Sequence, residues 1–321
     1  MPRTATTRTA AALAALLPAL ALTLAPVSPA SASPGPSTID LETGSLPEGI
    51  TTGPGSTFFA GARKDGAVRQ YSTVTGALLR TVVAPVAGEV AVGLLYDAAT
   101  KRLYVAGGGT GDITVYDAET GAVLFAANAG KGRFINDVTV TDTAAYFTDS
   151  TRGEILVLPF TTDGALPKEN KVRKLKLGGE YTQPEGFGLN GIRDLPDGDL
   201  LVVSGGLLYT VDPADGRTAQ RVEQAGRALT GGDGLELVGH TLYVVNGYGG
   251  NEVVVLRLEK GVTSTSVTTV LDQGDTPSPL DRPTTGALVD GDLYVVNGRF
   301  GTVGGTDGAA VTFSVSKFAL T

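Results

Sequence analysis

The 321-residue sequence contains no cysteine and a single histidine. Without cysteine the chain forms no disulfide and has no residue for lipoprotein anchoring, so its stability must come from a large hydrophobic core. One histidine and no cysteine also leave no copper or zinc site of the usual kind, because such sites use sulfur and imidazole ligands.

Long hydrophobic runs are missing after the N-terminus, so no membrane anchor is expected. The N-terminus itself carries Arg3 and Arg8, an apolar run broken by Pro18, and a small-x-small sequence that ends at Ala32. This pattern predicts a secretory signal peptide over residues 1–32, cleaved near Ala32. The remaining residues, 33–321, would form a single domain that is secreted to the extracellular space.

Basic residues are scarce, at 25 against 33 acidic ones, which gives a net charge of −8. Cleavage of the signal peptide would remove Arg3 and Arg8 and make the protein more acidic still. Nucleic acid and anionic membranes are therefore not expected as partners. A small-molecule substrate is expected, while the oligomeric state stays open, with a monomer favoured.

The chain repeats one short pattern six times, in which an apolar strand and a turn lead to a more aromatic strand that ends in a small or polar residue. The second strands read STFFAG, RLYVAGG, AAYFTDS, DLLVVSG, TLYVVNG and DLYVVNG. Short strands with turn signals and little helical periodicity predict an all-β fold, a six-bladed β-propeller of four-stranded antiparallel blades. The last blade lacks a fourth strand after residues 311–320, and residues 37–43 are expected to supply it and close the ring.

The first strands of the six repeats align on the residue before a recurring Gly-apolar pair. These residues are Glu48, Val92, Asn136, Asn190, Asp233 and Thr285, with Asp137 in place of the glycine in the third repeat. The first strands of a propeller line its central axis, so equivalent residues converge there. Glu48, Asn136, Asn190 and Asp233 offer oxygen ligands only, which selects a hard divalent cation. Ca²⁺ is preferred because it accepts longer and more flexible coordination, and Mg²⁺, Mn²⁺ and Zn²⁺ remain alternatives.

The segments PEGI, FINDV, LNGI and GDGL, in this order and on one register, resemble the senescence marker protein/gluconolactonase family of six-bladed propellers. The resemblance extends from about Leu46 to Phe300. It implies that Glu48, Asn136, Asn190 and Asp233 hold a metal ion and that Asp233 also acts as the catalytic base. Where gluconolactonase relatives often have an arginine two residues before the first asparagine, this chain has Phe134, and Arg133 lies one step further back.

Further candidates follow from hairpin geometry, because the end of each second strand lies beside the start of the first. Asp149, Asn246 and Asn297 end such strands, and the loops after the second strands carry Tyr248 and Arg299. Together with Arg133, these residues are predicted to bind substrate. Arg63 and Phe300 also lie on loops that could line the mouth of the site.

The leading hypothesis is a secreted metal-dependent hydrolase of the gluconolactonase-like type that acts on a lactone or related ester. The metal ion would act as a Lewis acid, and Asp233 would accept a proton from the attacking water or orient it. The alternative is a non-catalytic extracellular propeller that binds a ligand or a protein and contains a structural calcium ion. A hydrogen-bonded polar plug in place of any ion is a third interpretation of the four residues.

Overall fold

A computed structural model describes residues 35–301 and 310–320, which belong to the compact unit Ala32–Thr321. The predicted signal peptide over residues 1–32 lies outside the described residues. The described part is built mainly from strands, with short 3₁₀ turns such as Gly216–Thr218 and Lys260–Val262. None of the described residues forms a helix that is long and apolar enough to span a membrane.

Within residues 35–301 and 310–320, twenty-five strands form six sheets, each of which is one blade. The first blade contains β2 (Pro47–Thr52), β3 (Thr57–Ala62), β4 (Val68–Ser72) and β5 (Leu78–Val83). The second contains β6 (Leu94–Asp97), β7 (Arg102–Ala106), β8 (Asp112–Asp117) and β9 (Val123–Asn128). The third contains β10 (Ile135–Val140), β11 (Ala144–Asp149), β12 (Glu154–Pro159) and β13 (Arg173–Lys176).

The remaining blades follow the same order of strands from the inside outwards. The fourth contains β14 (Leu189–Asp194), β15 (Leu200–Ser204), β16 (Leu207–Val211) and β17 (Gln220–Arg221). The fifth contains β19 (Gly232–Val238), β20 (Thr241–Asn246), β21 (Glu252–Leu258) and β22 (Ser264–Leu271), with β18 (Glu223–Ala225) added at its edge. The sixth contains β23 (Pro283–Val289), β24 (Asp292–Asn297), β25 (Ser314–Phe318) and β1 (Thr38–Asp40).

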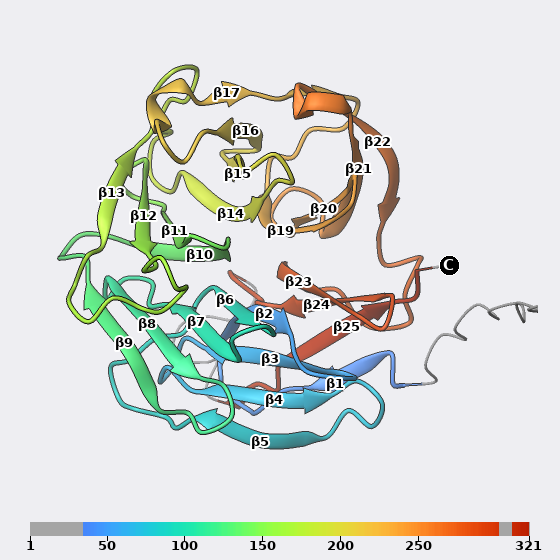
Figure 1. Cartoon of the computed structure of the whole chain (residues 1–321). Helices are drawn as coiled ribbons and strands as arrows, with labels where there is room; N and C mark the ends of the chain where they lie inside the picture. Colours follow the sequence, from blue (N-terminus) through green and yellow to red (C-terminus); the bar gives the residue numbers. More distant parts are fainter. Residues whose placement is uncertain (1–34, 302–309, 321) are drawn as a thin grey trace, which may run out of the picture. The chain divides into compact units, whose positions relative to one another are not determined.

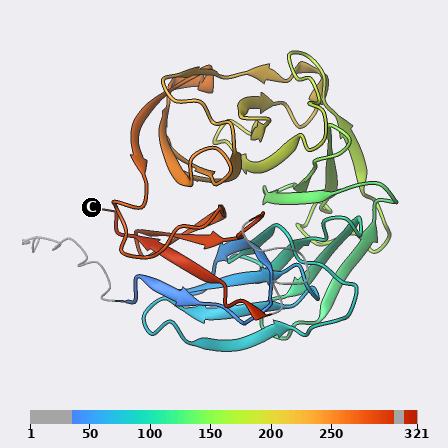
Figure 2. The ribbon, with the colours of Figure 1, turned by 180° about the vertical axis from the view of Figure 1, so that it is seen from behind.

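The six blades form a ring, and the predicted six-bladed propeller is confirmed (Figure 1). The innermost strands contact one another in the cyclic order β2, β6, β10, β14, β19, β23 and back to β2. From behind, the same sheets surround the same central region (Figure 2). The starts of these inner strands therefore gather at one end of the central axis, and their last residues gather at the other.

The sixth blade combines the two ends of the described chain. β1 pairs antiparallel with β25, with Ile39 opposite Val315. The Ile39 side chain is buried and packs with Val315 in the core between the first and sixth blades. The expected strand is thus present at residues 38–40, but that its pairing is what holds the ring closed stays a prediction.

The fifth blade differs from the expected four strands. Its additional strand, β18, runs parallel to β22, with Glu223 opposite Ser264. The outer strand of a blade exposes unpaired backbone groups along its edge. The connection from the fourth blade passes along this edge and pairs with those groups, a local arrangement that strand periodicity does not predict.

The hydrophobic core lies between neighbouring blades. One cluster joins Ile155 and Val157 of β12 to Leu200 and Val202 of β15, all of them fully buried. Each such side chain stabilises the fold by about 1.5–3 kcal/mol relative to exposure. This packing holds the third blade against the fourth.

Candidate functional site

Five of the six inner strands are irregular at the aligned position. The ladder to the second strand breaks between Pro47 and Ile50, Ile135 and Val138, Leu189 and Ile192, Gly232 and Leu235, and Pro283 and Gly286. A β-bulge turns a side chain away from the direction that a regular strand would give it. Glu48, Asn136, Asn190 and Asp233 all lie within these breaks.

The glycine after the aligned residue lets neighbouring blades approach closely. A Cβ on Gly49 would lie 2.0 Å from the Val92 carbonyl oxygen, and one on Gly93 would lie 2.2 Å from the Asn136 carbonyl oxygen. The Gly93 amide also donates a hydrogen bond to that oxygen at 2.8 Å. Backbone contact between blades therefore holds the aligned residues close to the axis.

Asp137 takes the place of this glycine in the third blade. Its Oδ2 accepts hydrogen bonds from the Ile192 amide at 3.1 Å and from Arg193 Nη1 at 3.3 Å. Arg193 Nη2 in turn donates to Glu236 Oε1 at 3.2 Å. A buried ionic network thus connects the third, fourth and fifth blades.

The four predicted metal ligands line one cavity of about 450 Å³ at the end where the inner strands begin. Glu48 is 5% exposed and Asp233 is 7% exposed, while Asn136 is buried and Asn190 is half-buried. The hydroxyls of Thr284 and Thr285 each donate to the Glu48 carbonyl oxygen at 2.6 Å, which fixes that backbone. The structure thus brings the four residues together, as the register of the repeats predicts.

Two carboxylate oxygens in this cavity lack partners. Glu48 Oε2 and Asp233 Oδ1 are buried and accept no hydrogen bond from the described residues. The amide nitrogen of Asn136 donates to Ser150 Oγ at 2.9 Å, which leaves its side-chain oxygen for another partner. Buried polar atoms are nearly always paired, so these oxygens need a ligand, a water or a proton.

The electrostatics of the cavity indicate the same need. Burial raises the pKa of Glu48 well above its ordinary value, the charges of Asp233 and Asp137 add to the rise, and Arg63 opposes it. Burial, followed by the charge of Asp137, raises the pKa of Asp233 to about 8, although the Asn190 side chain lowers it. Without a bound metal ion, Asp233 therefore holds a proton at neutral pH, and the pKa of Glu48 is shifted in the same direction.

A hard cation fits this set of donors. Two carboxylates and two amides supply only oxygen, and the two unpartnered oxygens belong to the acidic members. Within the described residues, no three His, Cys, Asp or Glu side chains cluster so as to hold an ion, and the predicted set contains only two residues of these types. Glu48, Asn136, Asn190 and Asp233 are the residues that could hold a metal.

The six predicted substrate-binding residues occupy different environments. Tyr248 lines the cavity, whereas the other five are absent from its lining. Arg133 is buried and donates through Nη1 to Asp149 Oδ2 at 2.6 Å and to Glu154 Oε2 at 2.8 Å. An ion pair that is satisfied in this way holds the start of β10 against the end of β11.

Asn246 and Asn297 end β20 and β24, and Arg299 lies in the loop after β24. Asn246 Oδ1 accepts from the Gly231 amide at 2.7 Å, and Asn297 Oδ1 accepts from the Asp281 amide at 2.9 Å. Arg299 Nε pairs with Asp281 Oδ2 at 2.9 Å. Of these contacts, the one from Asn246 holds a residue of the cavity wall, because Gly231 lines the cavity.

Other side chains line the cavity directly. Arg63 and Phe300, which the loop positions suggested, are among them, and so are Phe134, Phe187 and Thr230. Phe134 was visible in the sequence as a departure from the family pattern. Phe187 and Thr230 lie in connections whose paths only the packing of the blades determines, so no sequence signal marked them.

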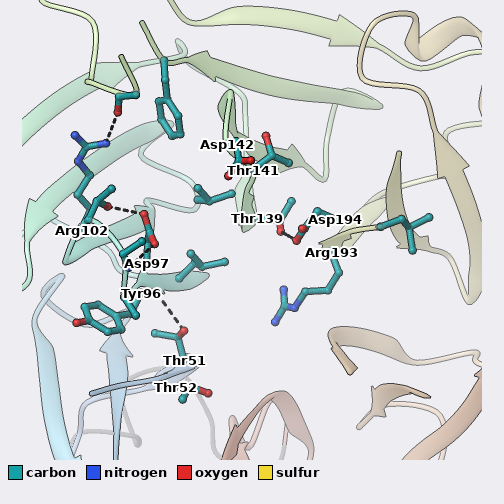
Figure 3. Close-up of a pocket in the computed structure, with 18 of the residues that line it drawn as sticks. Thr51, Thr52, Tyr96, Asp97, Arg102, Thr139, Thr141, Asp142, Arg193 and Asp194 are labelled. Carbon is teal, nitrogen blue, oxygen red and sulfur yellow. Dashed lines mark hydrogen bonds between the residues drawn. The ribbon is translucent and has the colours of Figure 1, made fainter. Parts of the chain in front are cut away.

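A second cavity, of about 730 Å³, lies at the other ends of the inner strands (Figure 3). Thr139 Oγ1 donates to Asp194 Oδ1 at 2.9 Å on its wall, and Arg193 extends into the space beside them (Figure 3). The side chains of Arg193 and Glu236 line this cavity, and their partner Asp137 also affects the pKa of Glu48 and Asp233. The ionic network therefore lies between the two cavities.

No family model matches the sequence, and neither does any curated protein. Solved structures are similar in fold. U3-55K aligns with a TM-score of 0.59 at 10% identity, over 88% of this chain and 98% of that one. Virginiamycin B lyase from Staphylococcus aureus aligns with a TM-score of 0.57 at 13% identity, over 88% of each chain. A streptogramin B lyase aligns with a TM-score of 0.55 at 12% identity, over 87% of this chain and 96% of that one. At these identities the likeness establishes the propeller fold alone.

Proposed function

We propose that this protein is an exported, metal-dependent hydrolase that acts on a lactone or related ester in the 450 Å³ cavity. One observation carries the proposal. Two buried carboxylates, Glu48 and Asp233, each present an unpartnered oxygen beside the amides of Asn136 and Asn190. Such a site is costly to keep ionised unless it binds a cation, and it opens into a space that admits a small molecule.

The four residues would hold one divalent ion, for which Ca²⁺ is the preferred candidate. When bound, this ion would supply Lewis acidity toward a carbonyl oxygen and would favour the ionised form of both carboxylates. Asn136 and Asn190 would add neutral oxygen ligands without adding charge. The bulges of β10 and β14 hold these two amides at the start of their strands.

Besides binding the metal ion, Asp233 would act as the catalytic base. Asp233 lines the cavity and its buried Oδ1 has no hydrogen-bond partner, so the carboxylate can accept a proton from a water molecule that attacks the substrate. Cation binding to the site would lower the pKa of Asp233 from about 8 and keep this oxygen unprotonated at neutral pH. Arg63 lines the same cavity and would stabilise negative charge that develops on the substrate.

The similar structures support the proposal only through their fold. Two of them are lyases by name, of virginiamycin B and of streptogramin B, so this architecture accommodates enzymes. Another is part of a nidogen/laminin complex, with a TM-score of 0.52 at 16% identity, so the same architecture also serves protein assembly. The choice between these uses must therefore come from the site.

The test is hydrolysis by the purified protein lacking residues 1–32, with lactones, aryl esters and phosphotriesters, in calcium and in excess chelator. We expect chelator-sensitive hydrolysis of a lactone or ester. Asp233→Asn keeps an oxygen ligand of similar size but no longer accepts a proton, so it should lower kcat by a factor of about 100 or more at saturating calcium. A protein that binds calcium tightly but hydrolyses none of these substrates would instead be a non-catalytic propeller with a structural ion.

A further inference from the structure

The mouth of the cavity is aromatic. Phe187 and Tyr248 are 60% and 58% exposed, which makes them two of the most exposed large hydrophobic side chains among the described residues. Phe187 packs edge-on against Phe134 with ring centroids 4.9 Å apart, and Tyr248 lies 6.2 Å from Phe300. Two aromatic pairs, from different blades, thus line a single cavity.

These rings are held in place by their surroundings. The Arg63 guanidinium lies 4.1 Å from the centroid of Phe300, and that of Arg282 lies 5.1 Å from the centroid of Tyr248. A cation–π contact at an exposed site stabilises the position of a ring by about 0.5–1 kcal/mol. The Tyr248–Phe300 side of the cavity is therefore partly organised before any ligand binds, which lowers the entropic cost of binding.

Hydrogen-bonding side chains are few in the same cavity. Apart from the four proposed metal ligands, the described lining contains only three polar side chains, Arg63, Thr230 and Tyr248. Five glycines, Gly188, Gly205, Gly206, Gly231 and Gly232, make up much of the rest and contribute no side chain. A sugar lactone carries hydroxyls around its ring, and each one that is buried without a partner weakens binding.

We propose that the cavity selects esters or lactones with an aromatic or large apolar substituent and discriminates against polyhydroxylated sugar lactones. The reacting carbonyl would lie at the polar floor, near Glu48 and Asp233. The substituent would pack between the Phe134–Phe187 pair and the Tyr248–Phe300 pair. The five glycines of the lining have no side chains and leave space for it there. This substrate class rests on the proposed hydrolase function, whereas the affinity for apolar groups rests on the aromatic wall alone.

The test compares three six-membered lactones of the same ring: glucono-δ-lactone, δ-valerolactone and a phenyl-substituted δ-valerolactone. We expect kcat/KM for the phenyl compound to exceed that for glucono-δ-lactone by a factor of about 100. The phenyl-substituted δ-valerolactam, which resists hydrolysis, should bind in calorimetry with calcium present. Phe187→Ala and Tyr248→Ala should each weaken lactam binding about tenfold and reduce the preference for the phenyl lactone.

Leu79→Ala is the matched control, because Leu79 is a similarly exposed apolar residue on β5 and does not line the cavity. It should leave binding and selectivity unchanged, and Phe187→Leu should restore most of the lactam affinity. Hydrolysis that favours glucono-δ-lactone, or that shows no preference, would overturn the substrate class while leaving the hydrolase intact. Lactam binding that depends on Phe187, without hydrolysis of any lactone, would support the aromatic site and refute the hydrolase.

Discussion

Replacing Asp233 with asparagine removes one of two neighbouring buried carboxylates, and we expect this to change how stability depends on pH when no metal is present. The folded state raises the pKa of Asp233 to about 8, from about 3.9 for an unfolded aspartate. Between these two values the folded protein binds a proton that the unfolded chain releases. The free energy of unfolding therefore falls as the pH rises from the unfolded pKa of Asp233, about 3.9, to its folded pKa, about 8.

The linkage relation sets the magnitude. One proton of difference corresponds to a slope of at most about 1.4 kcal/mol per pH unit. From pH 5 to pH 7 the free energy of unfolding of the wild type should therefore fall relative to that of Asp233→Asn by up to about 3 kcal/mol. Because Glu48 has a raised pKa for the same reasons, its own titration shares part of this effect.

The assay is urea unfolding in excess chelator at pH 5, 6, 7 and 8, with the wild type, Asp233→Asn and Asp142→Asn compared at each pH. Asp142 is an exposed carboxylate that does not line the 450 Å³ cavity, so its replacement should leave the pH dependence set by Asp233 unchanged. In saturating calcium the wild type should no longer lose stability as the pH rises, because the ionised carboxylates then bind the ion. If the free energies of unfolding of the wild type and Asp233→Asn differ by the same amount at all four pH values, the electrostatic description of the site is refuted.

Three further predictions concern the scaffold. Deleting residues 33–43 removes the buried Ile39 and Leu41, at a cost of about 4 kcal/mol, and should lower Tm by about 10 °C or cause aggregation; an unchanged, monomeric protein would contradict ring closure by β1. Gly93→Ala places a Cβ against the Asn136 carbonyl oxygen and should lose about 2–3 kcal/mol of stability in urea unfolding, whereas Gly109→Ala, with open space around it, should not. Arg193→Met leaves Asp137 and Glu236 buried without their cation and should lower the free energy of unfolding by about 3–5 kcal/mol. Adding Asp137→Gly should recover part of this loss, and an equal Tm for the single and double variants would argue against the network.

The propeller was predictable because its signals are local and repeated. Strands such as TLYVVNG and DLYVVNG alternate between the faces of a blade, and turn residues separate them at regular intervals. The convergence of Glu48, Asn136, Asn190 and Asp233 was predictable too, because equivalent positions in a ring meet at its axis. The additional strand β18 was not, since it depends on where one connection passes the edge of a neighbouring blade.

Residues at the ends of the second strands show the limit of reasoning from position. Asp149 and Asn246 were placed correctly along their strands, but their side chains are engaged by Arg133 and by Gly231 and Glu252. Sequence spacing shows where a Cα lies and does not show which partner its side chain finds. Phe187 is the opposite case, a cavity residue that its position in the sequence did not reveal. It lies in a connection without periodicity and contacts Phe134 at the mouth of the cavity.

Calcium titration calorimetry, with metal analysis of the same samples, tests whether Glu48, Asn136, Asn190 and Asp233 share one ion. We predict one bound calcium per wild-type chain, an affinity that rises with pH between 6 and 8 as protons leave the carboxylates, and loss of binding in Asp233→Ala and Asn190→Ala. Asp142→Ala should bind as the wild type does. Full calcium occupancy in both Asp233→Ala and Asn190→Ala would place the ion elsewhere, and no binding by the folded wild type would leave these four residues as a protonated polar cluster.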